Sequence, residues 1–254
     1  TLLISAIGYT KKEFIINSNK LNKQTFILKE NNDLLNEMVI SSTLQLIEKK
    51  NSPIPICVYS ANFLNTVPAP SLVDATNQIA GLRPQINCSV CNTGDIHING
   101  MEGAYSMVVV DGMPIMGGLS TVYGLQGIPT SLIAQLEVIK GPASTVYGSE
   151  AMAGVINVVT KDVNCIPKIA LDFNISSWGE LQSSLSLKYL DNKKLKAFSA
   201  IDIFQYNNPI DNNNDNFTDL TLKKRYSMFN KLQFFSKNGK NPLNISVRFL
   251  NEDR

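Results

Sequence analysis

The feature that most constrains the fold is a series of strand-like segments in residues 164–254 whose apolar and polar residues alternate. The alternation is clear at 169–175, 184–189 and 243–249 and blurred at 195–206 and 225–237. Successive side chains of a strand point to opposite faces, so each segment has one apolar and one polar face. Segments of about 10 residues with this pattern are typical of a transmembrane β-barrel. A soluble β-sandwich with one wet face has the same pattern, so both interpretations stay open.

From this pattern we expect about five antiparallel strands that continue one sheet. The connections at 176–180, 191–194 and 238–241 are short and the one at 207–224 is long, an asymmetry that fits a barrel wall. The residues expected to face outward are Ile169, Leu171, Phe173, Leu185, Leu187, Ile245, Val247 and Phe249. The residues expected to face the lumen are Lys168, Asp172, Ser184, Lys188, Asn244 and Arg248.

The composition excludes several classes of protein. With 44% hydrophobic residues, 17% charged residues and a formal net charge of +2, the chain is neither disordered nor a strongly basic nucleic-acid-binding module. No apolar run approaches the ~18 residues of a membrane-spanning helix. The single histidine, His97, excludes sites that need two imidazoles. No Walker loop, GxGxxG, GxSxG or clustered acid–base set is present, which disfavours an enzyme.

Three zones differ in pattern. Residues 1–29 are short alternating segments separated by polar turns, and residues 30–163 mix strands with short helices. In that middle zone Ser71 is a plausible N-cap for a helix that ends before Gly81, and strands are expected at 95–100, 106–110, 136–139 and 154–160. The chain starts and ends inside strand-like runs, so we interpret it as an internal fragment of a longer protein.

Two sequence blocks carry a resemblance to a known family. These are "DIHINGMEGAYSMVVVDGMPI" at 95–115 and "IPTSLIAQLEVIKGPASTVYGSEAMAGVINVVTKD" at 128–162. The second block, with its strand, Gly-Pro, Ser-x-x-Tyr-Gly and Val-Ile-Asn strand, is highly specific. Together they resemble the plug domain of TonB-dependent outer-membrane receptors. "LLISAIGYTKKEFII" near the start is similar to the end of a carboxypeptidase-regulatory-like domain, which receptors of the Bacteroidetes type often carry.

The resemblance implies the fold and the location. We expect an α+β plug domain followed by the first strands of an antiparallel transmembrane β-barrel and preceded by the end of a small β-sandwich. The corresponding domains are 1–29 for the sandwich, 30–163 for the plug and 164–254 for the incomplete barrel. The protein would be a monomeric barrel in the outer membrane of a Gram-negative bacterium, with no cofactor and no enzymatic activity.

The plug motif residues are expected to be structural. Gly141, Gly148 and Gly154 are expected to make tight turns with positive φ, where a Cβ would clash, and Tyr147 is an apolar anchor with a polar tip. The motif residues are Asp111, Gly112, Gly141, Pro142, Tyr147, Gly148, Gly154 and Asn157. The family usually has arginine where this chain has Asn99 and Lys140. Those arginines commonly pair with barrel carboxylates, so we expect a weaker or rearranged contact between plug and barrel.

The resemblance also implies a partner. Such receptors draw energy from a TonB-type protein that pairs with an extended segment near the receptor's N-terminus. The sequence "EMVISS" just before the plug has the right form, although an ordinary linker strand would look the same. The candidate partner-binding residues are Glu37, Met38, Val39, Ile40 and Ser41.

The cargo is expected to be a small organometallic or organic molecule that meets two outward loops, 87–94 and 114–127. The candidate ligand-facing residues are Asn87, Cys88, Cys91, Asn92, Met116, Leu119, Tyr123 and Leu125. Loops that only pack against the barrel are the alternative. A ferric siderophore is the expected cargo, and haem, cobalamin, copper and oligosaccharide stay open. A soluble β-sandwich adhesin or binding module is the alternative from a different class.

The four cysteines give one further expectation. Cys88 and Cys91 form a CxxC in the first outward loop, where a local disulfide is the simplest outcome in an oxidising compartment. A copper(I) site with Met101 or Met113 is the alternative, so no metal is assigned. Cys57 and Cys165 are single and are expected to be packed or unpaired thiols.

Overall fold

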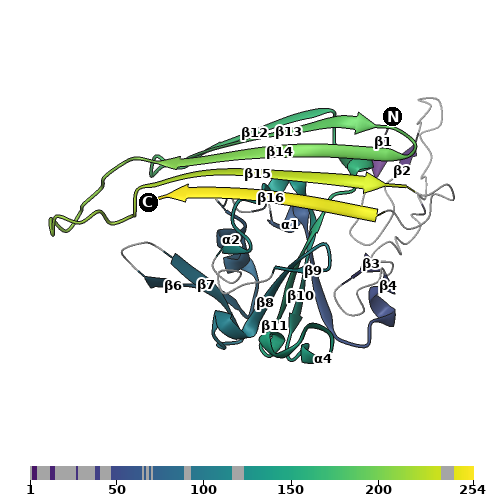
Figure 1. Cartoon of the computed structure of the whole chain (residues 1–254), viewed down its shortest axis with the longest axis horizontal. Helices are drawn as coiled ribbons and strands as arrows, with labels where there is room; N and C mark the ends of the chain where they lie inside the picture. Colours follow the sequence, from purple (N-terminus) through teal and green to yellow (C-terminus); the bar gives the residue numbers. More distant parts are fainter. Residues whose placement is uncertain are drawn as a thin grey trace, which may run out of the picture.

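The computed structural model describes residues 2–4, 12–14, 27, 38–40, 47–64, 66, 69, 71–88, 93–115, 123–235 and 243–254. Two sheets dominate it (Figure 1). A long five-stranded antiparallel sheet from the C-terminal part of the chain lies across a smaller mixed sheet with short helices. No helix among the described residues is long and apolar enough to cross a membrane.

The C-terminal sheet is a meander in which each strand pairs with the next along the chain. The pairing order is β12-β13-β14-β15-β16, antiparallel throughout. The prediction of about five strands that continue one sheet is therefore confirmed. The strands are β12 Ile169–Ile175, β13 Leu181–Asp191, β14 Leu195–Tyr206, β15 Lys223–Phe234 and β16 Leu243–Asp253.

The two faces of this sheet differ as the alternation predicts. The outer face carries exposed apolar side chains, for example Leu171 at 70% and Phe249 at 63% exposure. On the inner face Ser184 is buried, and Arg248 donates hydrogen bonds to the domain beneath. Lys168 precedes β12 and is exposed. The predicted register of the strands is thus correct.

The alternation of β14 and β15 is blurred in the sequence because their inner face is itself partly apolar. Phe198 and Phe229 lie on that face with ring centroids 6.0 Å apart. They form a buried cluster with Leu132, Val163 and Ile166, which precede the sheet. Where the inner face meets apolar residues it is apolar too, and the contrast with the outer face is lost.

The mixed sheet has the order β5-β10-β11-β8-β9. β11 pairs with β8 in parallel and the other pairs are antiparallel. The predicted strand at 154–160 has the observed bounds, and the strand at 136–139 extends in both directions. The strands are β5 Ile56–Ser60, β8 Ser106–Val110, β9 Met113–Pro114, β10 Ile133–Lys140 and β11 Gly154–Thr160.

Each face of the mixed sheet covers its own apolar cluster. Val108, Leu136 and Ile156 belong to the larger cluster, which includes residues of α2 and of the β6–β7 hairpin. Val109 and Val155 belong to the smaller cluster on the opposite face. Buried residues on both faces explain why β8, β10 and β11 are near-continuous apolar runs in the sequence.

The helices of the described part are short. Ser71 caps α2 as predicted, because its side chain accepts a hydrogen bond from the backbone nitrogen of Asp74. The α-helices are α1 Ala61–Leu64, α2 Leu72–Ala75 and α4 Ser144–Tyr147. The 3₁₀ helices are η2 Lys49–Asn51, η3 Thr76–Gln78, η4 Gly103–Tyr105, η5 Thr130–Leu132, η6 Ser149–Ala151 and η7 Val163–Cys165.

Three two-stranded pairs complete the fold. The first, β1–β2, lies within the zone expected to end a β-sandwich, and the second, β3–β4, precedes the mixed sheet. The third is the β6–β7 hairpin. The strands are β1 Leu2–Ile4, β2 Lys12–Phe14, β3 Met38–Val39, β4 Ile47–Glu48, β6 Leu82–Cys88 and β7 Thr93–Ile98.

Two of the predicted motif glycines are required by geometry. Gly154 has φ +150°, and a Cβ there would lie 2.1 Å from the carbonyl oxygen of Ile139. Gly112 has φ +81° and follows Asp111, which also has positive φ at 50°. This pair makes the tight turn between β8 and β9 that its sequence predicts.

We expect Tyr147→Phe to stabilise the fold. The Tyr147 side chain is 9% exposed, and its hydroxyl has no hydrogen-bond partner among the described residues. Removing this buried unpaired hydroxyl should raise the free energy of unfolding by about 1 kcal/mol at neutral pH. The matched control is Tyr105→Phe, since Tyr105 is exposed and its replacement should be neutral.

The stability gained by Tyr147→Phe should be larger at high pH than at neutral pH. Burial and the Glu137 carboxylate raise the pKa of Tyr147 from 10.0 to about 12. Above pH 10 the unfolded chain ionises before the folded one, so the wild type loses stability as the pH rises through that range. Urea unfolding at neutral pH and above pH 10 measures the difference. A gain that shrinks in alkali would contradict the assignment.

Candidate cargo cavity, wall contact and handle

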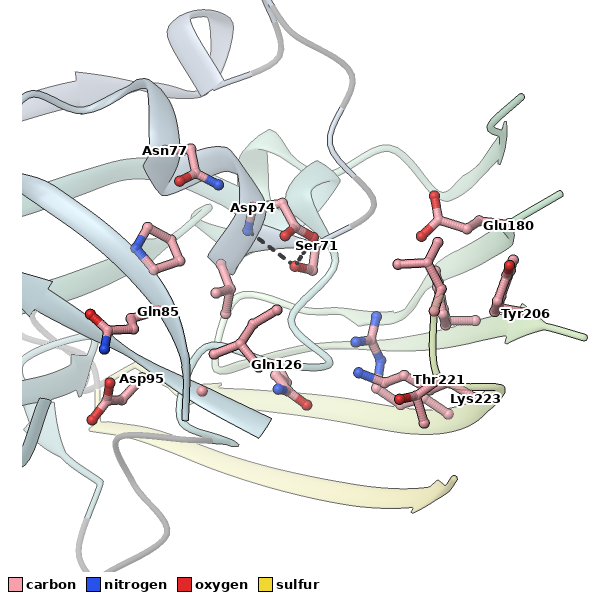
Figure 2. A pocket seen from close by; sticks show the side chains of 17 residues that line it. Ser71, Asp74, Asn77, Gln85, Asp95, Gln126, Glu180, Tyr206, Thr221 and Lys223 are labelled. Atoms are coloured by element: carbon pink, nitrogen blue, oxygen red, sulfur yellow. Dashed lines mark hydrogen bonds between the residues drawn. The ribbon is translucent and has the colours of Figure 1, made fainter. Parts of the chain in front are cut away.

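A cavity of about 340 Å³ lies between the mixed sheet's domain and the long meander. One side is lined by α2 and the β6–β7 hairpin, and the other by β14, β15 and the ends of neighbouring connections. Figure 2 shows Asp74, Gln85 and Asp95 on the first side and Glu180 and Tyr206 on the second. The residues that line it are thus far apart in the sequence and come together through the fold.

The α2 side of the cavity is fixed by the helix cap. Ser71 Oγ accepts from the Asp74 backbone nitrogen at 3.2 Å and donates to Asp74 Oδ2 at 2.6 Å, and both bonds are drawn in Figure 2. In the hairpin Asp95 lies 3.1 Å from Nε2 of His97. Two carboxylates are therefore held at defined places on this side.

The meander side of the cavity carries two cations. Arg225 is 2% exposed and lies 3.5 Å from Asp202, and Lys223 lies 3.3 Å from Glu252. Each cation thus has an acidic neighbour on the same sheet. The cavity as a whole contains both signs of charge, which suits a polar ligand more than a purely apolar one.

Besides Asp95 Oδ1, which faces His97, three polar atoms of the cavity lining are buried without a hydrogen-bond partner among the described residues. They are the Tyr206 hydroxyl, Oε1 of Gln126 and Nε of Arg225. The residues are 2%, 8% and 2% exposed. Buried polar groups normally form hydrogen bonds, so a ligand with both donors and acceptors would supply the missing partners in this cavity.

A second contact between the two domains is an ion pair. Lys231 of β15 is 4% exposed, and its Nζ lies 2.8 Å from Asp111 Oδ2 and 2.7 Å from Thr160 Oγ1. Asp111 also accepts from Thr160 N at 2.7 Å and Thr160 Oγ1 at 2.7 Å. We call this group the Asp111–Lys231 latch.

The latch answers the expectation of a rearranged contact. Asn99 is in a turn with φ 51°, and Lys140 Nζ lies 3.3 Å from the Tyr59 hydroxyl within the mixed-sheet domain. Among the described residues, neither Asn99 nor Lys140 forms an ion pair with the meander. In the latch the meander supplies the cation and the mixed-sheet domain supplies the carboxylate, the reverse of the polarity that the resemblance led us to expect.

Backbone contacts reinforce the latch. Arg248 of β16 donates to the carbonyl oxygens of Gly124 at 2.6 Å and Tyr123 at 3.3 Å. Ser227 Oγ donates to the Gly127 carbonyl at 2.9 Å. The described end of the second outward loop is thus fixed to the wall.

We call the predicted partner-binding segment, residues 37–41, the handle, and the structure describes Met38, Val39 and Ile40 of it. Val39 is fully buried in the smaller apolar cluster. The Ile40 nitrogen donates to Glu137 Oε1 and Oε2, both at 3.1 Å. Gln135 Nε2 donates to the Met38 carbonyl at 2.8 Å. These residues are therefore seated on β10.

The structure changes the assignment of two ligand-facing candidates. Leu125 is 2% exposed and belongs to the larger apolar cluster, so it packs in the core rather than facing a ligand. The guanidinium carbon of Arg254 lies over the Tyr123 ring, 5.6 Å from the ring centroid. The Tyr123 contact agrees with the alternative that this loop packs against the barrel strands, whereas Leu125 packs within the mixed-sheet domain.

The remaining candidates divide into two groups. Asn87 is exposed near the end of β6, and Cys88 ends that strand. Cys57 and Cys165 are free thiols, but Cys165 is exposed rather than packed. The candidates that lie outside the described residues are Glu37, Ser41, Cys91, Asn92, Met116 and Leu119, so the Cys88–Cys91 disulfide stays a prediction. Among the described residues no cluster of three or more His, Cys, Asp or Glu could hold a metal.

The sequence reasoning missed Glu137, Lys231 and the buried polar groups of the cavity. A signal for Glu137 was present, because it is one charge inside the apolar run "LEVI". Buried charges are rare unless they are paired or hydrogen-bonded. No local signal marks Lys231, because its partner Asp111 lies 120 residues away.

The comparisons with known proteins agree with this geometry. Residues 48–155 match the family model of the TonB-dependent receptor plug domain. The chain is 34% identical over 106 residues to the vitamin B12 transporter BtuB of Vibrio vulnificus, covering 41% of this chain and 17% of BtuB. It is 38% identical over 82 residues to a probable TonB-dependent siderophore receptor, PirA, of Acinetobacter baumannii, covering 28% of this chain and 11% of PirA.

The fold is also similar to solved receptors. FpvA of P. aeruginosa, bound to iron and a heterologous pyoverdine, matches with a TM-score of 0.64 at 14% identity, covering 85% of this chain and 27% of FpvA. The ferric yersiniabactin uptake receptor FyuA of Yersinia pestis matches with a TM-score of 0.62 at 19% identity, covering 78% of this chain and 31% of FyuA. The chain spans less than a third of these proteins.

BtuB and PirA are a transporter and a receptor rather than enzymes, which agrees with the expectation drawn from the absent motifs. The mixed-sheet domain corresponds to the matched plug region, and the meander corresponds to strands like those of the receptor barrels. Residues 48–155 therefore match the TonB-dependent receptor plug domain, and the described chain is similar in fold to the plug and adjoining strands of TonB-dependent receptors.

Proposed function

We propose that the whole protein is a TonB-dependent outer-membrane transporter that imports a ferric siderophore. The observation that carries the proposal is a plug domain fastened beneath a sheet whose outer face is apolar and whose inner face mixes polar residues with an apolar cluster around Phe198 and Phe229. An exposed apolar face on a long antiparallel sheet is suited to contact with lipid. The polar cavity between plug and sheet is then the place where cargo meets the receptor.

The siderophore is favoured by the relatives and by the chemistry of the cavity. FpvA binds an iron–pyoverdine complex, and FyuA is a ferric yersiniabactin uptake receptor. A ferric chelate rich in oxygen atoms would find both donors and acceptors among Tyr206, Gln126 and Arg225. Cobalamin is the second candidate, and the similarity to BtuB supports it.

The domain layout is part of the proposal. Residues 1–29 would end a carboxypeptidase-regulatory-like β-sandwich of the Bacteroidetes type, 30–163 would form the plug and 164–254 the first strands of the barrel. The antiparallel pairing of β1 with β2 supports strand structure at the start. The segment at 37–41 would be the handle that a TonB-type protein pairs with from the periplasm.

Tyr206→Phe tests the cavity. The hydroxyl has no partner among the described residues, so its removal should not destabilise the unloaded receptor. If the cargo binds this hydroxyl, the variant should bind it about threefold to tenfold more weakly. Titration of the full-length receptor with ferric pyoverdine and with vitamin B12 measures the change and separates the two candidates.

The control for Tyr206 is Tyr226→Phe on the exposed outer face of the neighbouring strand, which should leave binding unchanged. If either ligand bound tightly to wild type and Tyr206→Phe equally well, the cavity would not be the cargo site.

Val39→Pro tests the handle in the full-length receptor. Proline removes a backbone N–H that a partner strand would use, so energised uptake of radioactive iron should be lost while binding of ferric pyoverdine persists. Because Val39 is buried, Val39→Ala is the matched control, which removes side-chain packing and keeps the N–H. If Val39→Pro took up iron as well as Val39→Ala does, the handle would lie elsewhere in the protein.

A further inference from the structure

The Glu137 carboxylate lies at the centre of the plug sheet and is fully buried. It accepts hydrogen bonds from Asn157 Nδ2 at 3.1 Å, Gln135 Nε2 at 2.9 Å and the Ile40 nitrogen at 3.1 Å. A buried carboxylate is costly unless donors replace the water it has lost. The backbone of the handle supplies one of those donors.

Gln135, two residues before Glu137 on β10, holds the preceding part of the handle. Its Nε2 donates to the Met38 carbonyl at 2.8 Å. Residues i and i+2 of a strand share one face, so Gln135 and Glu137 together bind one carbonyl and one N–H of the handle. Their side chains thus satisfy the handle backbone much as a neighbouring strand would.

The contacts continue from Glu137 towards the barrel wall. Asn157 Oδ1 accepts from the Gly112 nitrogen at 3.2 Å. A Cβ on Gly112 would lie 3.1 Å from Cγ2 of Ile40, so the handle also abuts this turn. Asp111, the residue before Gly112, is the plug member of the latch with Lys231. Handle, turn and latch therefore form one contiguous network.

We propose that Glu137 is the positioning residue that seats the handle, and that departure of the handle loosens the Asp111–Lys231 latch. Removal of the Ile40 N–H leaves the carboxylate one donor short, which disturbs Asn157 and the Gly112 N–H that it binds. The turn is held in positive φ, so the loss of this hydrogen bond weakens the placement of Asp111. The inference rests on the proposed function only in regarding residues 38–40 as the handle.

Hydrogen exchange of the full-length receptor in detergent, without cargo or partner, tests the seating. In Glu137→Gln the amides of residues 38–40 should exchange about tenfold faster, because bonds to the charged group are lost. Protection of β10 and β11 should stay as in the wild type. Gln135→Ala should also speed exchange at residues 38–40. Because it alters only a half-buried polar side chain, it still tests the seating if Glu137→Gln fails to fold. Glu150→Gln, an exposed plug glutamate, is the matched control.

Lys231→Met tests the coupling, because the side-chain partners of Lys231 in the described part of the chain are Asp111 and Thr160 and not residues 38–40 or Glu137. Exchange at residues 38–40 should rise in this variant as well. Unchanged exchange there would overturn the coupling, and general loosening of β10 and β11 in both Glu137→Gln and Gln135→Ala would overturn the seating. Uptake plays no part in this measurement, so a failure of the proposed transport function is seen separately in the Val39→Pro test.

Discussion

Two carboxylates, the fully buried Glu137 and the partly buried Asp111, hold the parts of the molecule together. A carboxylate removed from water must be paired or hydrogen-bonded. Asp111 accepts hydrogen bonds from Lys231 of the meander and Thr160 of the mixed sheet, while Glu137 accepts them from the Ile40 backbone and Asn157. Both carboxylates lie on strands or turns of one sheet, so the meander and residues 38–40 are placed relative to the same rigid element.

The wall in turn depends on having two unlike faces. Its inner face is covered by the plug through Lys231, Ser227 and Arg248, and through an apolar cluster centred on Phe198 and Phe229. Its outer face leaves large apolar side chains exposed. In the proposed transporter, lipid covers that outer face. The cavity beside α2 is the place where plug and sheet do not touch, and cargo would bind there.

Local patterns predicted the local structure well. Strict alternation predicted β12, β13 and β16, and a polar cap followed by Gly81 predicted the extent of α2 and η3. These features depend on neighbouring residues, which the sequence displays directly. The motif from Leu136 to Thr160 also predicted the plug strands.

The contacts between distant residues could not be predicted in the same way. Lys231 lies on a strand whose inner face mixes Phe229 with polar residues, so neither its direction nor its partner is visible in the pattern. Leu125 looks like a loop residue suited to a ligand, but the fold places it in the core. The cavity is formed by residues from α2, a hairpin and the wall, and only the tertiary structure brings them together.

The most direct test of this account is a double-mutant cycle across the latch. Asp111→Asn, Lys231→Met and the double variant would be compared by the urea dependence of plug unfolding in the full-length receptor. A buried pair should give a coupling free energy above about 1 kcal/mol, because each single change leaves the other group buried without its partner. Single effects that add to within about 0.5 kcal/mol would show that the two residues are independent and that the plug is fastened to the wall by other contacts.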